Sequence, residues 1–135
     1  MYARILIEYL AERPEAPFHW ADNNCCHFAA RWVARATGRD PMAEWPPTKS
    51  AAAARRFIRA MGGDLAGLWD RCMPRSIPAT QAQDGDLMLI SLDGLTLTGG
   101  TAVAVCSGRH AITQDHTGAT FYVTRDRAVR AWALE

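Results

Sequence analysis

Apolar residues recur about every three to four positions in the first half of the chain, which predicts helices. The second half instead has short β-rich runs between glycine-containing turns, which predict strands. We expect helices over residues 2–12, 25–37, 51–61 and 65–72, and strands over residues 86–92, 101–107, 110–114, 119–123 and 129–134. Helices followed by antiparallel strands predict an α+β domain, in which the N-terminal helices pack on a small antiparallel sheet.

Local signals indicate where these elements begin and end. Asn23 or Asn24 can cap the second helix, and Gly38 can end it, because glycine adopts the left-handed conformation that helix ends require. Asp93-Gly94 is a signal for a hairpin turn between the first two long strands.

Composition and charge narrow the class of protein. The 135 residues are enough for one domain, which we place at residues 1–135, and 15 basic against 14 acidic residues leave a net charge of +1. A nucleic-acid-binding domain normally has a strong positive field, so nucleic acid is not expected as a partner. The chain has no run of 18 apolar residues, so no membrane span is expected. It also lacks a signal-peptide pattern, which predicts synthesis in the bacterial cytoplasm with reduced thiols.

Cys25 and Cys26 fall in the first turn of the second predicted helix. Unpaired N–H groups and the helix dipole at this position lower the pKa of a thiol from its ordinary value of about 8.5, and the thiolate is the nucleophilic form. Cys25 shares a helical stripe with Phe28 and Trp32, so we expect it at the floor of a cleft between helix and sheet. Buried packing is the alternative interpretation, because cysteine often behaves as a small hydrophobic residue.

No cofactor or metal is expected. Cys25-Cys26-His27 lacks the gaps of about two to four residues that allow neighbouring ligands to converge on one zinc ion. The glycine pairs follow neither the dinucleotide-binding nor the phosphate-loop pattern.

The segment around Cys25 resembles the nucleophile motif of a known family. Trp20-Ala21-Asp22-Asn23-Asn24-Cys25-Cys26-His27-Phe28 has the spacing of Trp-Gly-x-x-Asp-Cys-x-x-Phe in NlpC-type peptidases. These are papain-like cysteine amidases that act on bacterial cell-wall peptides. Their following Gly-Asp-aliphatic strand start is similar to Gly85-Asp86-Leu87. The resemblance covers about residues 17–133 and implies a papain-like fold, with Cys25 as the candidate nucleophile.

A narrower resemblance is to a small family from prophage and gene-transfer-agent-like tail gene clusters. The matching segments are Phe28-Ala29-Ala30, Thr37-Gly38-Arg39-Asp40-Pro41, Val103-Ala104-Val105-Cys106-Ser107-Gly108 and Ala131-Trp132. This resemblance implies a tail protein that contacts other tail proteins of the hub or baseplate.

The chain departs from the peptidase pattern at the catalytic histidine. The aligned position is Thr101, and a threonine cannot act as an imidazole base. The position of the residue that orients this histidine falls near Thr113 or Gln114, and Gln114 is the candidate that could orient a base. His110 and His116 are the histidines downstream of Thr101, and His110 is the candidate for a relocated base.

We therefore expect a phage or prophage tail-tip or tail-assembly component with an NlpC-like fold and a degenerate catalytic site, located in the virion after assembly. An alternative is an active cysteine amidase or endopeptidase that cuts peptidoglycan peptides during infection, with Cys25 as its nucleophile. A third hypothesis is a binding module that holds a peptide or acyl group in the cleft.

Overall fold

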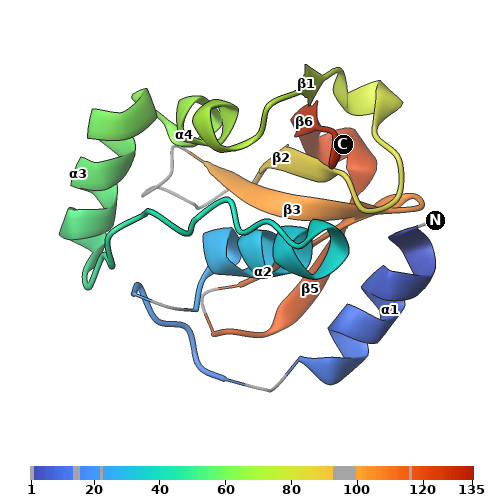
Figure 1. The fold of residues 1–135 in the computed structure, drawn as a ribbon, viewed down its shortest axis with the longest axis horizontal. Coiled ribbons are helices and arrows are strands. Elements are labelled where there is room, and N and C mark those ends of the chain that lie inside the picture. The colour runs from blue at the N-terminus through green and yellow to red at the C-terminus, as the bar shows by residue number, and fades with distance from the viewer. Residues whose placement is uncertain (1, 14–15, 22, 93–99, 116) are drawn as a thin grey trace.

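The computed structural model describes residues 2–13, 16–21, 23–92, 100–115 and 117–135. Four helices come first: α1 (Tyr2–Glu12), α2 (Cys25–Thr37), α3 (Ala51–Gly62) and α4 (Leu65–Cys72). The strands follow: β1 (Ser76–Ile77), β2 (Leu87–Ser91), β3 (Thr101–Ser107), β4 (His110–Gln114), β5 (Thr120–Thr124) and β6 (Ala128–Trp132). They form one sheet in the order β1-β6-β2-β3-β4-β5, and the pairs are antiparallel (Figure 1).

The α+β class is confirmed, and most predicted elements lie within two residues of their expected bounds. Three short elements were not predicted, because they carry no periodic signal: β1, which pairs with the end of β6, and the 3-10 turns η1 (Ala79–Gln81) and η2 (Arg125–Arg127). The predicted turn at Asp93-Gly94 lies outside the described residues.

Helix α2 forms where its capping residues predict. The side-chain oxygen of Asn24 accepts hydrogen bonds from the backbone N–H groups of Cys26 and His27, at 3.0 and 3.2 Å. Gly38 ends the helix in the left-handed conformation, with φ of 81°. The face between these ends buries Phe28 and Trp32 completely, and the Trp32 indole donates to the carbonyl of Gly85 at 2.7 Å. This anchors α2 to the turn that precedes β2.

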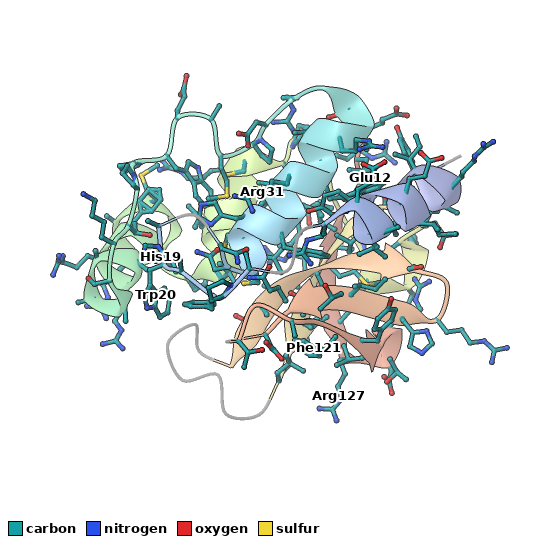
Figure 2. The ribbon with its side chains drawn as sticks, turned by 90° about the horizontal axis from the view of Figure 1, so that it is seen from below. Glu12, His19, Trp20, Arg31, Phe121 and Arg127 are labelled. Carbon is teal, nitrogen blue, oxygen red and sulfur yellow. The ribbon has the colours of Figure 1, made fainter. Side chains whose placement is uncertain are left out.

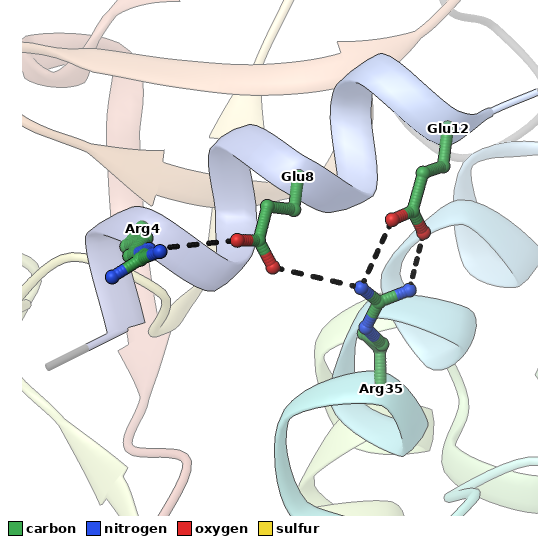
Figure 3. A network of polar contacts seen from close by, with 4 residues as sticks. All are labelled: Arg4, Glu8, Glu12 and Arg35. Atoms are coloured by element: carbon green, nitrogen blue, oxygen red, sulfur yellow. Dashed lines mark hydrogen bonds and ion pairs between the residues drawn. The ribbon is translucent and has the colours of Figure 1, made fainter.

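Helix α1 packs beside α2, and a surface network of charges joins the two helices (Figure 3). Arg35 of α2 donates to both carboxylate oxygens of Glu12, at 2.5 and 3.2 Å, and lies 3.8 Å from Glu8. Arg4 pairs with Glu8 at 3.5 Å. The side chains are solvent-exposed, so water screens these pairs and they contribute little to stability.

The sheet is strongly curled. The 3-10 turn η2 (Arg125–Arg127) alone joins β5 to β6, although four strand spacings separate them in the sheet, which is about 19 Å when flat. A 3-10 turn of this length spans only about 8 Å, so the sheet must curve to bring the two strands together. Arg125 stabilises this closure by donating to the carbonyls of Ala79 and Ala82 at 3.1 and 2.9 Å.

The two faces of the sheet carry different side chains. One face packs large residues against the helices, which lie together on one side of the sheet (Figure 2). The other face is covered by the curl of the sheet itself, and it buries Ala82, Met88, Ile90, Ala102, Ala104, Cys106, Ala111 and Ala131. Alanine predominates because little space remains inside the curve. None of the described helices has the length and apolar character needed to cross a bilayer.

Candidate functional site

Cys25 is the first residue of α2, and its side chain packs against the alanine-rich cluster of the sheet. The next residue, Cys26, packs instead against the cluster that the helices share, which contains Trp69. Successive side chains on a helix point about 100° apart, so the two thiols face different surroundings. Cys25 packs between α2 and the sheet, and both thiols line the same cavity, Cys26 from the helical side.

The two thiols interact, and their pKa values move in opposite directions. A hydrogen bond from the thiol of Cys26 lowers the pKa of Cys25; burial raises it, and backbone N–H groups of Val103, Cys26 and Cys25 lower it again. The net effect is a pKa below the ordinary range of a thiol. The same hydrogen bond, followed by burial, raises the pKa of Cys26. Cys25 is therefore the better nucleophile of the pair.

A cavity of about 960 Å³ opens beside Cys25, at the end of the sheet where β2 and β4 stop and β3 and β5 start. Its sheet side includes Thr101, Gln114 and Phe121. The part of its wall formed by α3, α4 and the loop before α3 includes the apolar residues Trp45, Ala54, Phe57, Ile58, Leu65 and Leu68, whereas α2 and the loop directly after it add the charged residues Arg31 and Asp40. Trp20 also lines the cavity and lies next to the helices in Figure 2, whereas Phe121 lies on the strands below them. Apolar walls with a few polar groups are typical of small-molecule and peptide sites.

The structure brings Thr101 and Gln114 to this cavity together with Cys25. Residues of a strand alternate between its faces, so Thr101 lies on the same face of β3 as Val103, which packs toward the helices. Extending the β3–β4 register by two residues places Gln114 opposite Val103, whose N–H group points to the Cys25 sulfur. The three candidate residues thus belong to one site.

One family of related sequences has a profile that matches this chain over residues 1–134, and its description is "Domain of unknown function (DUF6950)". The chain belongs to this family. The match spans Cys25, Thr101 and Gln114, so the cavity lies within the DUF6950 domain. The comparison with curated proteins found no match.

In this DUF6950 domain, His110 and His27 lie at different positions relative to the Cys25 cavity. His110 begins β4, at the opposite end of the strand from Gln114 and thus about 13 Å away along the strand. It is exposed and contacts the ring of Tyr122, so the structure does not bring this base candidate to the cavity. His27 lines the cavity but lies two residues after Cys25, which turns its side chain about 200° away around α2. His116 lies outside the described residues.

Arg13 also belongs to the site, although no sequence pattern indicated it. This residue follows α1, and its guanidinium donates to Gln114 Oε1 at 2.5 Å and to Thr120 Oγ1 at 2.6 Å. The guanidinium also lies 4.6 Å from the centre of the Phe28 ring, within the range of a cation–π contact. Arg13 and Gln114 are 101 positions apart in the chain, so no local pattern could have connected them.

Proposed function

We propose that this protein is a tail-tip or tail-assembly component of a phage or prophage, with an NlpC-like, papain-like fold. Its Cys25 cavity binds a peptide or acyl group of the cell wall without hydrolysing it. A cysteine at the start of a helix that packs on an antiparallel sheet supports the fold assignment. The resemblance to tail-cluster proteins supports the location and the partners.

One observation carries the proposal that the site binds without cleaving. Thr101 begins β3 and lines the Cys25 cavity, and the resemblance to NlpC-type peptidases aligns it with their catalytic histidine. Amide hydrolysis needs a group that protonates the leaving amine, and a threonine hydroxyl has no suitable pKa. A cavity of this size with aromatic walls remains suited to holding a ligand.

A binding and turnover experiment tests this proposal. Purified protein is titrated with defined muropeptides by calorimetry, and parallel samples are incubated and analysed for new amino termini. We expect saturable binding and no cleavage product, in both the wild type and Cys25→Ala. The absence of binding would contradict the proposed ligand class. For the tail assignment, mass spectrometry of density-purified tail particles from the source organism should detect the chain at a fixed ratio to the tail proteins.

An active amidase is the second candidate, because the lowered pKa of Cys25 increases the fraction of the nucleophilic thiolate. The same incubation separates the two candidates. Product that forms with the wild type and is lost in Cys25→Ala would favour the amidase and reject the binding-only function.

A further inference from the structure

The amide of Gln114 can adopt only one orientation. Its Oε1 accepts a hydrogen bond from Arg13, and a guanidinium has donors but no acceptor. Turning the amide over would bring the NH₂ group of Gln114 against the donors of Arg13. Oε1 must therefore face Arg13, and Nε2 must point to the other side.

Arg13 is itself held by contacts from three elements. It donates to Gln114 at the end of β4 and to Thr120 at the start of β5, and it lies on the Phe28 ring of α2. These contacts leave the guanidinium little freedom, so they also restrict the rotation of the Gln114 amide. The positively charged guanidinium of Arg13 thus lies behind the Gln114 side chain and not in the lining of the cavity.

Nε2 of Gln114 is a buried donor that has no acceptor among the described residues. The residue is only 5% exposed, and this nitrogen makes no hydrogen bond with a described residue. Buried polar groups in folded proteins nearly always have a partner, so an orphan donor beside a cavity is a candidate hydrogen-bond donor to a bound ligand. Gln114 lines the cavity that also contains the thiol of Cys25.

We propose that Arg13 is a positioning residue, which orients the Gln114 amide so that Nε2 donates a hydrogen bond to a carbonyl oxygen of the ligand in the Cys25 cavity. The inference rests on the proposed function, because it takes the ligand to be a peptide or acyl group. A neutral N–H donor among aromatic walls that include Trp20 and Phe121 suits a neutral carbonyl with apolar substituents. The Gln114 amide thereby selects for amide-bearing ligands.

The reactivity of Cys25 toward two alkylating reagents tests this role. Iodoacetamide has an amide carbonyl beside its reactive carbon, whereas allyl bromide has no hydrogen-bond acceptor of this kind. Rate constants at Cys25 are measured by peptide mapping across a pH series and extrapolated to the full thiolate, which removes any effect of a changed pKa. The ratio of the two rate constants, relative to that of N-acetylcysteine, is the measured quantity. One hydrogen bond to the carbonyl raises this ratio by about five- to tenfold in the wild type.

The variants separate positioning from folding. Gln114→Glu keeps an oxygen for Arg13 and removes the Nε2 donor, so the ratio should fall to that of N-acetylcysteine while the allyl bromide rate persists. Arg13→Met frees the amide and should lower the ratio by about half or more, whereas Arg13→Lys, which can still donate to Oε1, should restore part of it. Gln81→Glu makes the same charge change on the exposed η1 turn and should leave the ratio unchanged.

The outcomes distinguish this inference from the proposed function. A ratio that is high in the wild type and falls in Gln114→Glu supports the donor role of Gln114, even if muropeptides fail to bind in the calorimetric experiment. A ratio that is unchanged in Gln114→Glu overturns the inference, even if muropeptides bind. A loss that is equal for both reagents in Arg13→Met, with no recovery in Arg13→Lys, overturns the positioning role of Arg13.

Discussion

The two sides of the Cys25 cavity differ in what their side chains can do. The helical side, formed by α3, α4 and the preceding loop, is a packed apolar wall that includes Leu65 and Leu68, each 1% exposed. The sheet side carries the polar groups, Thr101 and Gln114, and the N–H group of Val103 that faces the Cys25 sulfur. Cys25 packs against the sheet side and Cys26 against the helical side; the pKa of Cys25 is lowered, whereas the pKa of Cys26 is raised. We infer that the helical side maintains the shape of the cavity, while the polar groups of the sheet side determine its chemistry.

Truncation on the helical side should have the largest effect on stability. Leu68→Ala leaves a hole in the wall between α4 and the cavity and should cost about 2–5 kcal/mol of unfolding free energy. Thr101→Ala, on the half-buried sheet side, should cost less than about 1 kcal/mol. Urea denaturation of both variants measures the difference. Equal losses of unfolding free energy in the two variants would show that the helical side does not contribute more to stability than the sheet side.

Adding an imidazole on the sheet side should change the chemistry of Cys25. In Thr101→His, an imidazolium that faces the thiol should lower the pKa of Cys25 by about 1–3 units, because a nearby positive charge favours the thiolate. The pH dependence of alkylation at Cys25 reports this shift. Thr101→Gln, which adds polar bulk without a positive charge, is the matched control. A midpoint shared by both variants would place residue 101 too far from the sulfur to act on it.

Removing the thiol of Cys26 should raise the pKa of Cys25, which is the opposite of the effect expected for Thr101→His. Cys26→Ala deletes the donor that contributes most to lowering the pKa of Cys25, so this pKa should rise. The alkylation midpoint of Cys25 then moves to higher pH. Cys72→Ala removes another half-buried thiol that does not act on Cys25 and should leave the midpoint unchanged. A midpoint that moves to lower pH in Cys26→Ala would reverse the assigned donor.

The smallest effect concerns how stability depends on pH. The pKa of Cys25 is depressed by folding, so its contribution to stability is present above the unfolded pKa of about 8.5 and is lost as pH falls. The pKa of Cys26 is raised, so its contribution is present below about 8.5 and is lost as pH rises. The two oppose each other in the wild type. Cys25→Ala removes the Cys25 contribution and also the hydrogen bond that raises the pKa of Cys26, so only the trend caused by burial of Cys26 remains. Between pH 7.5 and 9.5 the variant should therefore lose more stability than the wild type. Urea unfolding at the two pH values measures this, and a variant that gains stability would contradict it.

Much of the fold could be predicted because its signals are local. Asn24 and Gly38 mark the two ends of α2 through hydrogen bonds and a backbone conformation that involve only neighbouring residues. The apolar stripe of Phe28 and Trp32 likewise follows from helical spacing alone, and both side chains are fully buried. The curl of the sheet could not be predicted in this way, because it depends on how far apart β5 and β6 lie in the strand order.

In the candidate site, too, residues with a local sequence signal could be predicted, whereas those that depend on distant contacts could not. Cys25 could be identified because a thiol in the first turn of a capped helix has a known effect on its own pKa. Thr101 and Gln114 came from a resemblance, and the structure places both in the cavity. Arg13 was missed, since its role exists only through contacts with Gln114, Thr120 and Phe28, which are distant from it in the chain.

The amino-acid sequence by itself determined the helices and strands of this protein, and it placed a cysteine where a helix N-terminus favours the thiolate. Hydrogen bonds between near neighbours and the period of apolar residues are sufficient for that. Only the tertiary structure decided that Cys26 also reaches the cavity, which way the Gln114 amide turns and where His110 lies. These depend on strand register, on the rotation of α2 about its axis and on contacts across 101 positions of the chain, which no short segment encodes.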